Sequence, residues 1–231
     1  MSTDPLIQRI VCLVLVAFYF LLRVGEYTKP WFLIRNGKRL PATCTKQFVV
    51  GNIGLFKSRV VIPRTSPLEL ILTSELAVMK ISNQKNGKMG QTITQHATGT
   101  TECPVTTLVH IFHDILSDRG NYDTLLCLVW NGTKWANAEA HNVIKMVHDT
   151  VKDLKLHLQD TYYYLAGAHL FRSWVAMALK LQGYDYTTIM KMGQWTSLTF
   201  LRYIHNQISH PSKDISSKMS ISLPFVNVSY I

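Results

Sequence analysis

The feature that most constrains the fold is an uninterrupted apolar run near the start of the chain. Residues 10–22, IVCLVLVAFYFLL, carry no charge and lie between Arg9 and Arg23. A transmembrane helix needs about 20 apolar residues, so this run is too short to span a bilayer. No small-residue cleavage site follows it, which argues against a signal peptide. We therefore expect a helix over residues 5–28 that is buried on nearly all sides, and no membrane partner.

The next part of the chain has the pattern of short strands. Residues 31–73 hold β-type runs, such as QFVVGNI and SRVVIP, between Gly, Pro and Asn breaks. Residues 75–84 and 91–98 are also rich in β-branched side chains, and they flank the segment KNGKMG. The Asn-Gly pair in that segment predicts a β-hairpin with a rather long loop.

Helical patterns dominate the second half. Residues 103–116 begin with a proline in the first turn, and residues 137–156 carry apolar side chains at helical spacing. Further helices are expected to about residue 208. The predicted fold class is α+β, mainly α, with a small antiparallel β-sheet. We expect one domain over residues 1–210, followed by a C-terminal tail over residues 211–231.

Charge and composition restrict the partners. Lys and Arg number 24 against 14 Asp and Glu, giving a net charge of +10, which suits a polyanion such as nucleic acid. Hydrophobic residues make up 47% of the chain, enough for a substantial core. The four cysteines form no CxxC pair and the histidines no HExxH motif, so we expect a reducing compartment and no metal or other cofactor.

Three polar motifs stand out against the apolar pattern. Arg23 directly follows the apolar run, so it needs an acidic partner or an anionic ligand, and Glu26 is a candidate partner. His169 and Arg172 are three residues apart at the start of a predicted helix and share one face. Tyr203 lies at the edge of the apolar face of the last predicted helix, which begins at Thr196 or Ser197.

In this order, the motifs resemble those of the tyrosine recombinases, most closely the Crypton and DIRS-like kinds from eukaryotic mobile elements. The resemblance covers residues 10–210 and rests on LLRVGEY, HLFR and IMKMGQWTSLTFLRYIH. It implies the catalytic core of a phage-integrase-like enzyme that cleaves and rejoins duplex DNA through a 3′-phosphotyrosyl intermediate. The biological role implied is site-specific recombination or DNA integration of a mobile element, without a cofactor.

The resemblance also implies roles for single residues. Tyr203 matches the nucleophile of the family, and Arg23 and Arg172 match the two arginines that clamp the scissile phosphate. His169 matches the histidine of the HxxR motif. Guanidinium groups suit this task because they are permanently charged and fork-shaped for bidentate contact with phosphate oxygens.

For two further roles in the family, two nearby residues of this chain are both candidates. The hairpin lysine of the family, a candidate general acid, matches Lys85, with Lys88 as the alternative. Trp195 matches the His or Trp that follows a glycine in the family, but Gln194 is the residue nine before the tyrosine. Either of these two side chains is a candidate for the phosphate contact.

The family also implies an assembly and a location. Its members work as tetramers on paired sites and pass a C-terminal segment to a neighbour, a role that residues 211–231 could fill. The location implied is the nucleus in a eukaryote, and otherwise the cytoplasm or nucleoid.

Three alternatives remain. The family usually has an N-terminal DNA-clamping domain, and small residues where this chain has Trp174 and Val175; these departures favour an inactive DNA-binding relic. A type IB topoisomerase-like activity would use the same chemistry. A membrane-associated helical protein would explain residues 10–22 but not the ordered Arg, His, Arg and Tyr.

Overall fold

The computed structural model describes residues 4–29, 32–35, 38–41, 46–81, 90–153, 170–195, 197 and 201. Its helices are α1 (Pro5–Tyr19), α2 (Val24–Tyr27), α3 (Leu68–Ile71), α4 (Pro104–Ser117), α5 (Ala140–Asp153), α7 (Leu170–Leu181) and α8 (Tyr186–Gly193). Its strands are β1 (Phe32–Arg35), β2 (Lys38–Pro41), β3 (Ile53–Lys57), β4 (Val60–Val61), β5 (Leu76–Lys80), β6 (Thr92–His96), β7 (Leu128–Trp130) and β8 (Trp135–Asn137). The α+β class is confirmed. The chain divides into two compact units, Met1–Val175 and Ala176–Ile231.

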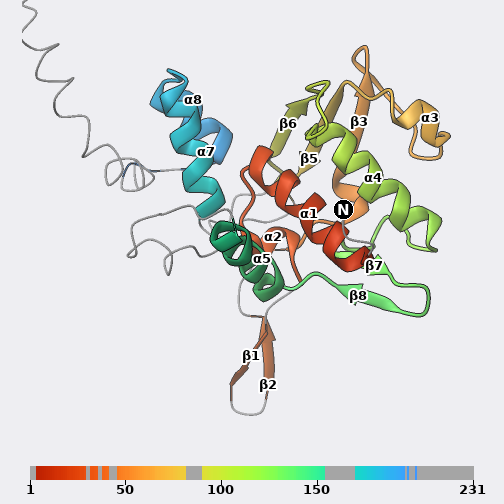
Figure 1. Cartoon of the computed structure of the whole chain (residues 1–231). Helices are drawn as coiled ribbons and strands as arrows, with labels where there is room; N and C mark the ends of the chain where they lie inside the picture. Colours follow the sequence, from red (N-terminus) through yellow and green to blue (C-terminus); the bar gives the residue numbers. More distant parts are fainter. Residues whose placement is uncertain are drawn as a thin grey trace, which may run out of the picture. The chain divides into compact units, whose positions relative to one another are not determined.

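The first unit is built on a four-stranded antiparallel sheet in the order β4-β3-β5-β6. The central pair is aligned with Ile53 opposite Met79, and both side chains are fully buried. Strands β1 and β2 form a separate two-stranded ribbon, as do β7 and β8. Helix α4 contacts both β5 and β6, and α1 packs against α4 (Figure 1). The core therefore lies between this helix pair and the sheet.

The apolar run forms most of α1 and supplies much of that core. Asp4 caps the helix, because its Oδ1 accepts a hydrogen bond from the Leu6 N–H at 2.8 Å. The fully buried residues of α1 lie on one side of the helix, and they are Arg9, Ile10, Leu13, Val16 and Ala17. Ile7, Gln8 and Val11 on the other side are exposed, so the prediction of a helix buried on nearly all sides is only partly right. Burying one large aliphatic side chain contributes about 1.5–3 kcal/mol, so this run is a major source of stability.

Arg9 is a buried cation whose needs are met inside the protein. Its side chain is 3% exposed, and its Nη1 donates to the carbonyls of Ile111 and Leu126, each at 3.4 Å. Its Nη2 lies 3.3 Å from the carboxylate of Asp114. Burial lowers the pKa of the Arg9 guanidinium, and the charge of Asp114 opposes that shift. Arg9 therefore ties α1 to α4.

The prediction of one helix over residues 5–28 is wrong. Helix α1 ends at Tyr19, and the chain turns through Leu21, whose φ is +50°, before α2 begins at Val24. The reason is tertiary, because the turn buries all three residues from Phe20 to Leu22 in the core. Arg23 consequently caps a second short helix and does not lie at the end of the first.

The predicted hairpin and the predicted start of α4 agree with the structure, whereas one predicted strand does not. The hairpin is confirmed, because β5 and β6 pair from Leu76 opposite His96 to Lys80 opposite Thr92. The predicted strand over QFVVGNI is mostly wrong, since residues 50–52 form a 3₁₀ turn and β3 starts only at Ile53. Pro104 begins α4 as predicted.

Candidate active site

Arg23 is held at a fixed position by Glu26. Its Nη1 lies 3.0 Å from Glu26 Oε1, and its backbone N–H donates to Glu26 Oε2 at 2.7 Å. The Glu26 side chain is 3% exposed, whereas that of Arg23 is 20% exposed. Within the part of the chain that is described, no protein group accepts a hydrogen bond from Arg23 Nε or Nη2. The buried carboxylate of Glu26 therefore fixes the guanidinium of Arg23, and the N–H groups on Nε and Nη2 remain available to bind an anion.

Helix α2 is itself anchored by the segment that precedes the sheet. The Phe48 N–H donates to the Glu26 carbonyl at 2.8 Å, and Gln47 Nε2 donates to the Gly25 carbonyl at 3.0 Å. These bonds satisfy backbone groups of a helix too short to be stable alone. The backbone that carries Arg23 is therefore preorganised by contacts far along the chain.

Tyr27 directly follows Glu26 in the sequence, but its environment makes it unsuited to be a nucleophile. Its side chain is 1% exposed, and its hydroxyl finds no hydrogen-bond partner among the residues that the structure describes. Burial, reinforced by the charge of Glu26, raises the pKa of the Tyr27 phenol well above its ordinary value. A phenol that stays protonated and covered cannot attack a phosphate.

The β5–β6 hairpin carries the candidate lysines in its connection. Pairing continues past the strands, since the Ile81 N–H donates to Gln91 O at 2.8 Å and Gly90 N–H donates to Ile81 O at 3.1 Å. Lys85 and Lys88 belong to residues 82–89, which lie outside the described residues. Their place between two paired strands agrees with the predicted hairpin, and the choice between them stays open.

Helix α7 carries Arg172 in its first turn. Its side chain is buried, with 5% exposure, and belongs to the same compact unit as Arg23. His169 immediately precedes the helix and lies outside the described residues. The helix ends before Gly183, which adopts φ +87°, and the Tyr184 N–H donates back to Leu179 O at 3.1 Å.

Trp195 belongs to the second unit and packs on the end of α8. A Cβ added at Gly193 would overlap the ring of Trp195, so only glycine allows this packing. Gln194 caps α8 in the left-handed region, with φ +53°, and the Trp195 N–H donates to Met190 O at 3.0 Å. The ring joins a small apolar cluster that includes Ile189. Helix α8 ends at Gly193.

The structure describes three of the six predicted site residues. Arg23 and Arg172 share one unit, and Trp195 lies in the other. Tyr203 and the tail 211–231 lie outside the described residues, and of the predicted helix that carries Tyr203 only residues 197 and 201 are described. The convergence of all six on one phosphate stays a prediction.

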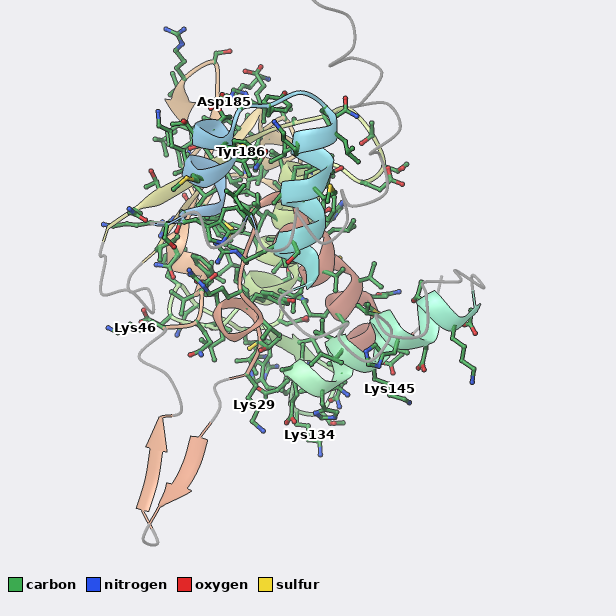
Figure 2. The ribbon with its side chains drawn as sticks, turned by 90° about the vertical axis from the view of Figure 1, so that its left-hand side faces the viewer. Lys29, Lys46, Lys134, Lys145, Asp185 and Tyr186 are labelled. Atoms are coloured by element: carbon green, nitrogen blue, oxygen red, sulfur yellow. The ribbon has the colours of Figure 1, made fainter. Side chains whose placement is uncertain are left out.

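One group of lysines could not be predicted from the sequence. Lys29, Lys46, Lys134 and Lys145 come from four separate segments and lie in the lower half of the view in Figure 2. No motif connects them, so only their position in the fold brings them to notice.

Other kinds of site find no support in the described ranges. No group of three or more His, Cys, Asp or Glu side chains there could hold a metal ion. None of the helices described is both long and apolar enough to cross a membrane. No protein-family model matches the chain, and no curated protein matches its sequence.

Proposed function

We propose that this chain is a tyrosine recombinase catalytic domain that cleaves and rejoins duplex DNA. The observation that supports this most is the way Arg23 is held. A guanidinium fixed by a buried carboxylate, on a backbone anchored by residues 47 and 48, is preorganised to bind a phosphate at the surface. The motif order described above supplies the other groups.

The chemistry follows from what a phosphodiester requires. Negative charge accumulates on its non-bridging oxygens in the transition state, and Arg23 and Arg172 offset that charge. The Tyr203 oxygen forms a bond to phosphorus while the bond from phosphorus to the 5′-oxygen breaks. The phenol gives its proton to His169, and the leaving oxygen takes a proton from Lys85 or, in its place, from Lys88. A side-chain N–H of Trp195 or, in its place, of Gln194 donates to the phosphate.

The covalent link conserves the energy of the broken bond. A 5′-hydroxyl from a partner strand attacks the phosphotyrosine, restores the phenol and rejoins the DNA. In this proposal the enzyme acts as a tetramer on paired sites, exchanges residues 211–231 between protomers, and integrates or recombines a mobile element in the nucleus or nucleoid.

The test is whether a covalent adduct forms. The full chain is incubated with a pool of labelled, nicked duplexes of random sequence, whose released fragment diffuses away after cleavage. We expect a labelled adduct in a denaturing gel, lost in Tyr203→Phe and kept in Tyr184→Phe, which changes an exposed tyrosine. Non-covalent binding without any adduct would instead identify an inactive DNA-binding relic. An adduct that persists in Tyr203→Phe would refute the assignment of the nucleophile.

A further inference from the structure

A group of lysines forms a basic face on the unit Met1–Val175. We call this set, Lys29, Lys46, Lys134 and Lys145, the lysine face (Figure 2). The side chains of Lys46, Lys134 and Lys145 are exposed, and that of Lys29 is 40% exposed. Single exposed lysines are common on protein surfaces, whereas a group of them with few nearby carboxylates attracts an anionic partner.

Hydrogen bonds of the backbone tie this face to α2. The Lys29 N–H donates to Ala138 O at 3.0 Å, which joins the end of α2 to the start of α5. Gln47 donates to the Gly25 carbonyl, so its neighbour Lys46 also lies beside α2. The lysine face therefore adjoins the short helix that Arg23 caps.

The two remaining lysines lie on elements that follow directly. Lys134 closes the turn between β7 and β8, where its N–H donates to Asn131 Oδ1 at 2.9 Å. Lys145 lies on the exposed side of α5, one turn before Asp149. Both elements adjoin Ala138, whose carbonyl accepts the hydrogen bond from the Lys29 N–H, so one short segment of the fold links these three lysines.

The charges on this face are only partly balanced. Lys29 Nζ lies 2.7 Å from Glu139 Oε1, and His141 Nδ1 lies 3.3 Å from the other oxygen of Glu139. The hydrogen bond from Lys29 lowers the pKa of Glu139, so this carboxylate is ionised at neutral pH. Over the ranges that the structure describes, no carboxylate forms an ion pair with any of the other three lysines.

We propose that the lysine face binds the sugar–phosphate backbone of duplex DNA beyond the scissile phosphate. Lys46, Lys134 and Lys145 would contact phosphates, while Glu139 neutralises Lys29 and so limits the affinity. Such contacts position a protein on DNA without reading its sequence. The choice of DNA as the partner rests on the proposed function, but its test does not depend on catalysis.

The salt dependence of binding tests this inference. A fluorescent duplex of random sequence is titrated with the full chain carrying Tyr203→Phe, over a range of KCl concentrations. Each lysine–phosphate contact contributes about 0.9 to the slope of log K against log salt. The triple variant Lys46→Gln, Lys134→Gln, Lys145→Gln should therefore reduce the steepness of that slope by about 2.7.

A matched triple variant controls for net charge. Lys57, Arg59 and Arg119 are exposed cations of the same unit that do not belong to the lysine face, and their replacement by Gln removes the same charge. We expect that variant to change the slope far less. Equal losses in both triple variants, or no loss in the first, would overturn the inference.

The role of Glu139 provides a gain-of-binding test. Glu139→Gln should release Lys29 and make the slope steeper by up to about 0.9, whereas Glu69→Gln, at an exposed glutamate elsewhere, should not. The same proteins are also mixed with phosphatidylserine vesicles. Lysine-dependent binding to vesicles without binding to the duplex would overturn the inference in favour of a membrane surface. Adduct formation, assayed separately, decides only the proposed function.

Discussion

Replacing Glu26 by Gln tests whether the buried carboxylate holds Arg23 in place. The substitution keeps the size of the side chain and removes its charge. The amide oxygen can still accept the hydrogen bond from the Arg23 backbone N–H, now 2.7 Å long. The amide nitrogen, a donor, would then face the guanidinium, where Glu26 Oε1 now lies 3.0 Å from Nη1. One bond is weakened and the other is lost.

The structure allows the cost to be estimated. A hydrogen bond to a charged group contributes about 1.5–3 kcal/mol and a neutral one about 0.5–1.5, so the weakened bond costs about 1 kcal/mol. The lost ion pair is partly buried, with side-chain exposures of 20% for Arg23 and 3% for Glu26. Water can reach the arginine, so this loss stays below the 3–5 kcal/mol of a fully buried pair and adds about 1–2 kcal/mol. We expect Glu26→Gln to lower the free energy of unfolding by about 2–3 kcal/mol.

Urea unfolding of the full chain measures this cost, and hydrogen exchange localises it to α2. The control is Glu139→Gln, the same substitution in the exposed Lys29–Glu139 pair, where we expect a loss of under about 1 kcal/mol. In an Arg23→Met background the loss caused by Glu26→Gln should shrink, because the ion pair is already absent. Equal losses for Glu26→Gln and Glu139→Gln would refute the idea that Glu26 anchors Arg23.

Two further predictions concern other parts of the chain. Gly193→Ala should destabilise the second unit by about 1–3 kcal/mol because the new methyl group overlaps the ring of Trp195. Thermal unfolding measures this change. A loss of stability that persists in a Trp195→Ala background would contradict the explanation. Burial raises the pKa of the Cys103 thiol, but hydrogen bonds from Thr106 and Thr98 outweigh it and lower the pKa from its ordinary value of 9.0 to about 7. The folded protein should therefore gain about 1–2 kcal/mol of stability as the pH rises from 7 to 9 and lose it as the pH falls through 7. Unfolding free energies at the two pH values should show this rise in the native protein and a smaller one in Cys103→Ala, and equal rises would rule out the thiolate as the cause.

Features that depend on neighbouring residues could be predicted from the sequence. Pro104 begins α4, and Gly183 follows α7 in the left-handed conformation, because proline and glycine restrict or permit backbone angles wherever they stand. The β5–β6 hairpin was also predictable, since its two strands are close in sequence. The motifs on which the resemblance to tyrosine recombinases rests are likewise short local patterns.

Features that depend on distant contacts could not be predicted. Residues 19–23 contain no Gly or Pro that would predict the break between α1 and α2. The break forms because the side chains of the turn are buried in the core. The 3₁₀ turn over residues 50–52 has a similar cause, since Val50 and Gly51 bond to the backbone at Thr124 and Tyr122.

The same division applies to the candidate site. The sequence by itself determined which residue types are available, including an arginine with a glutamate three positions later. Only the tertiary structure decided that Glu26 is buried beneath an accessible Arg23, and that lysines from four segments share one face. The physical reason is that burial and charge balance depend on which distant segments pack together, and no short sequence pattern encodes that.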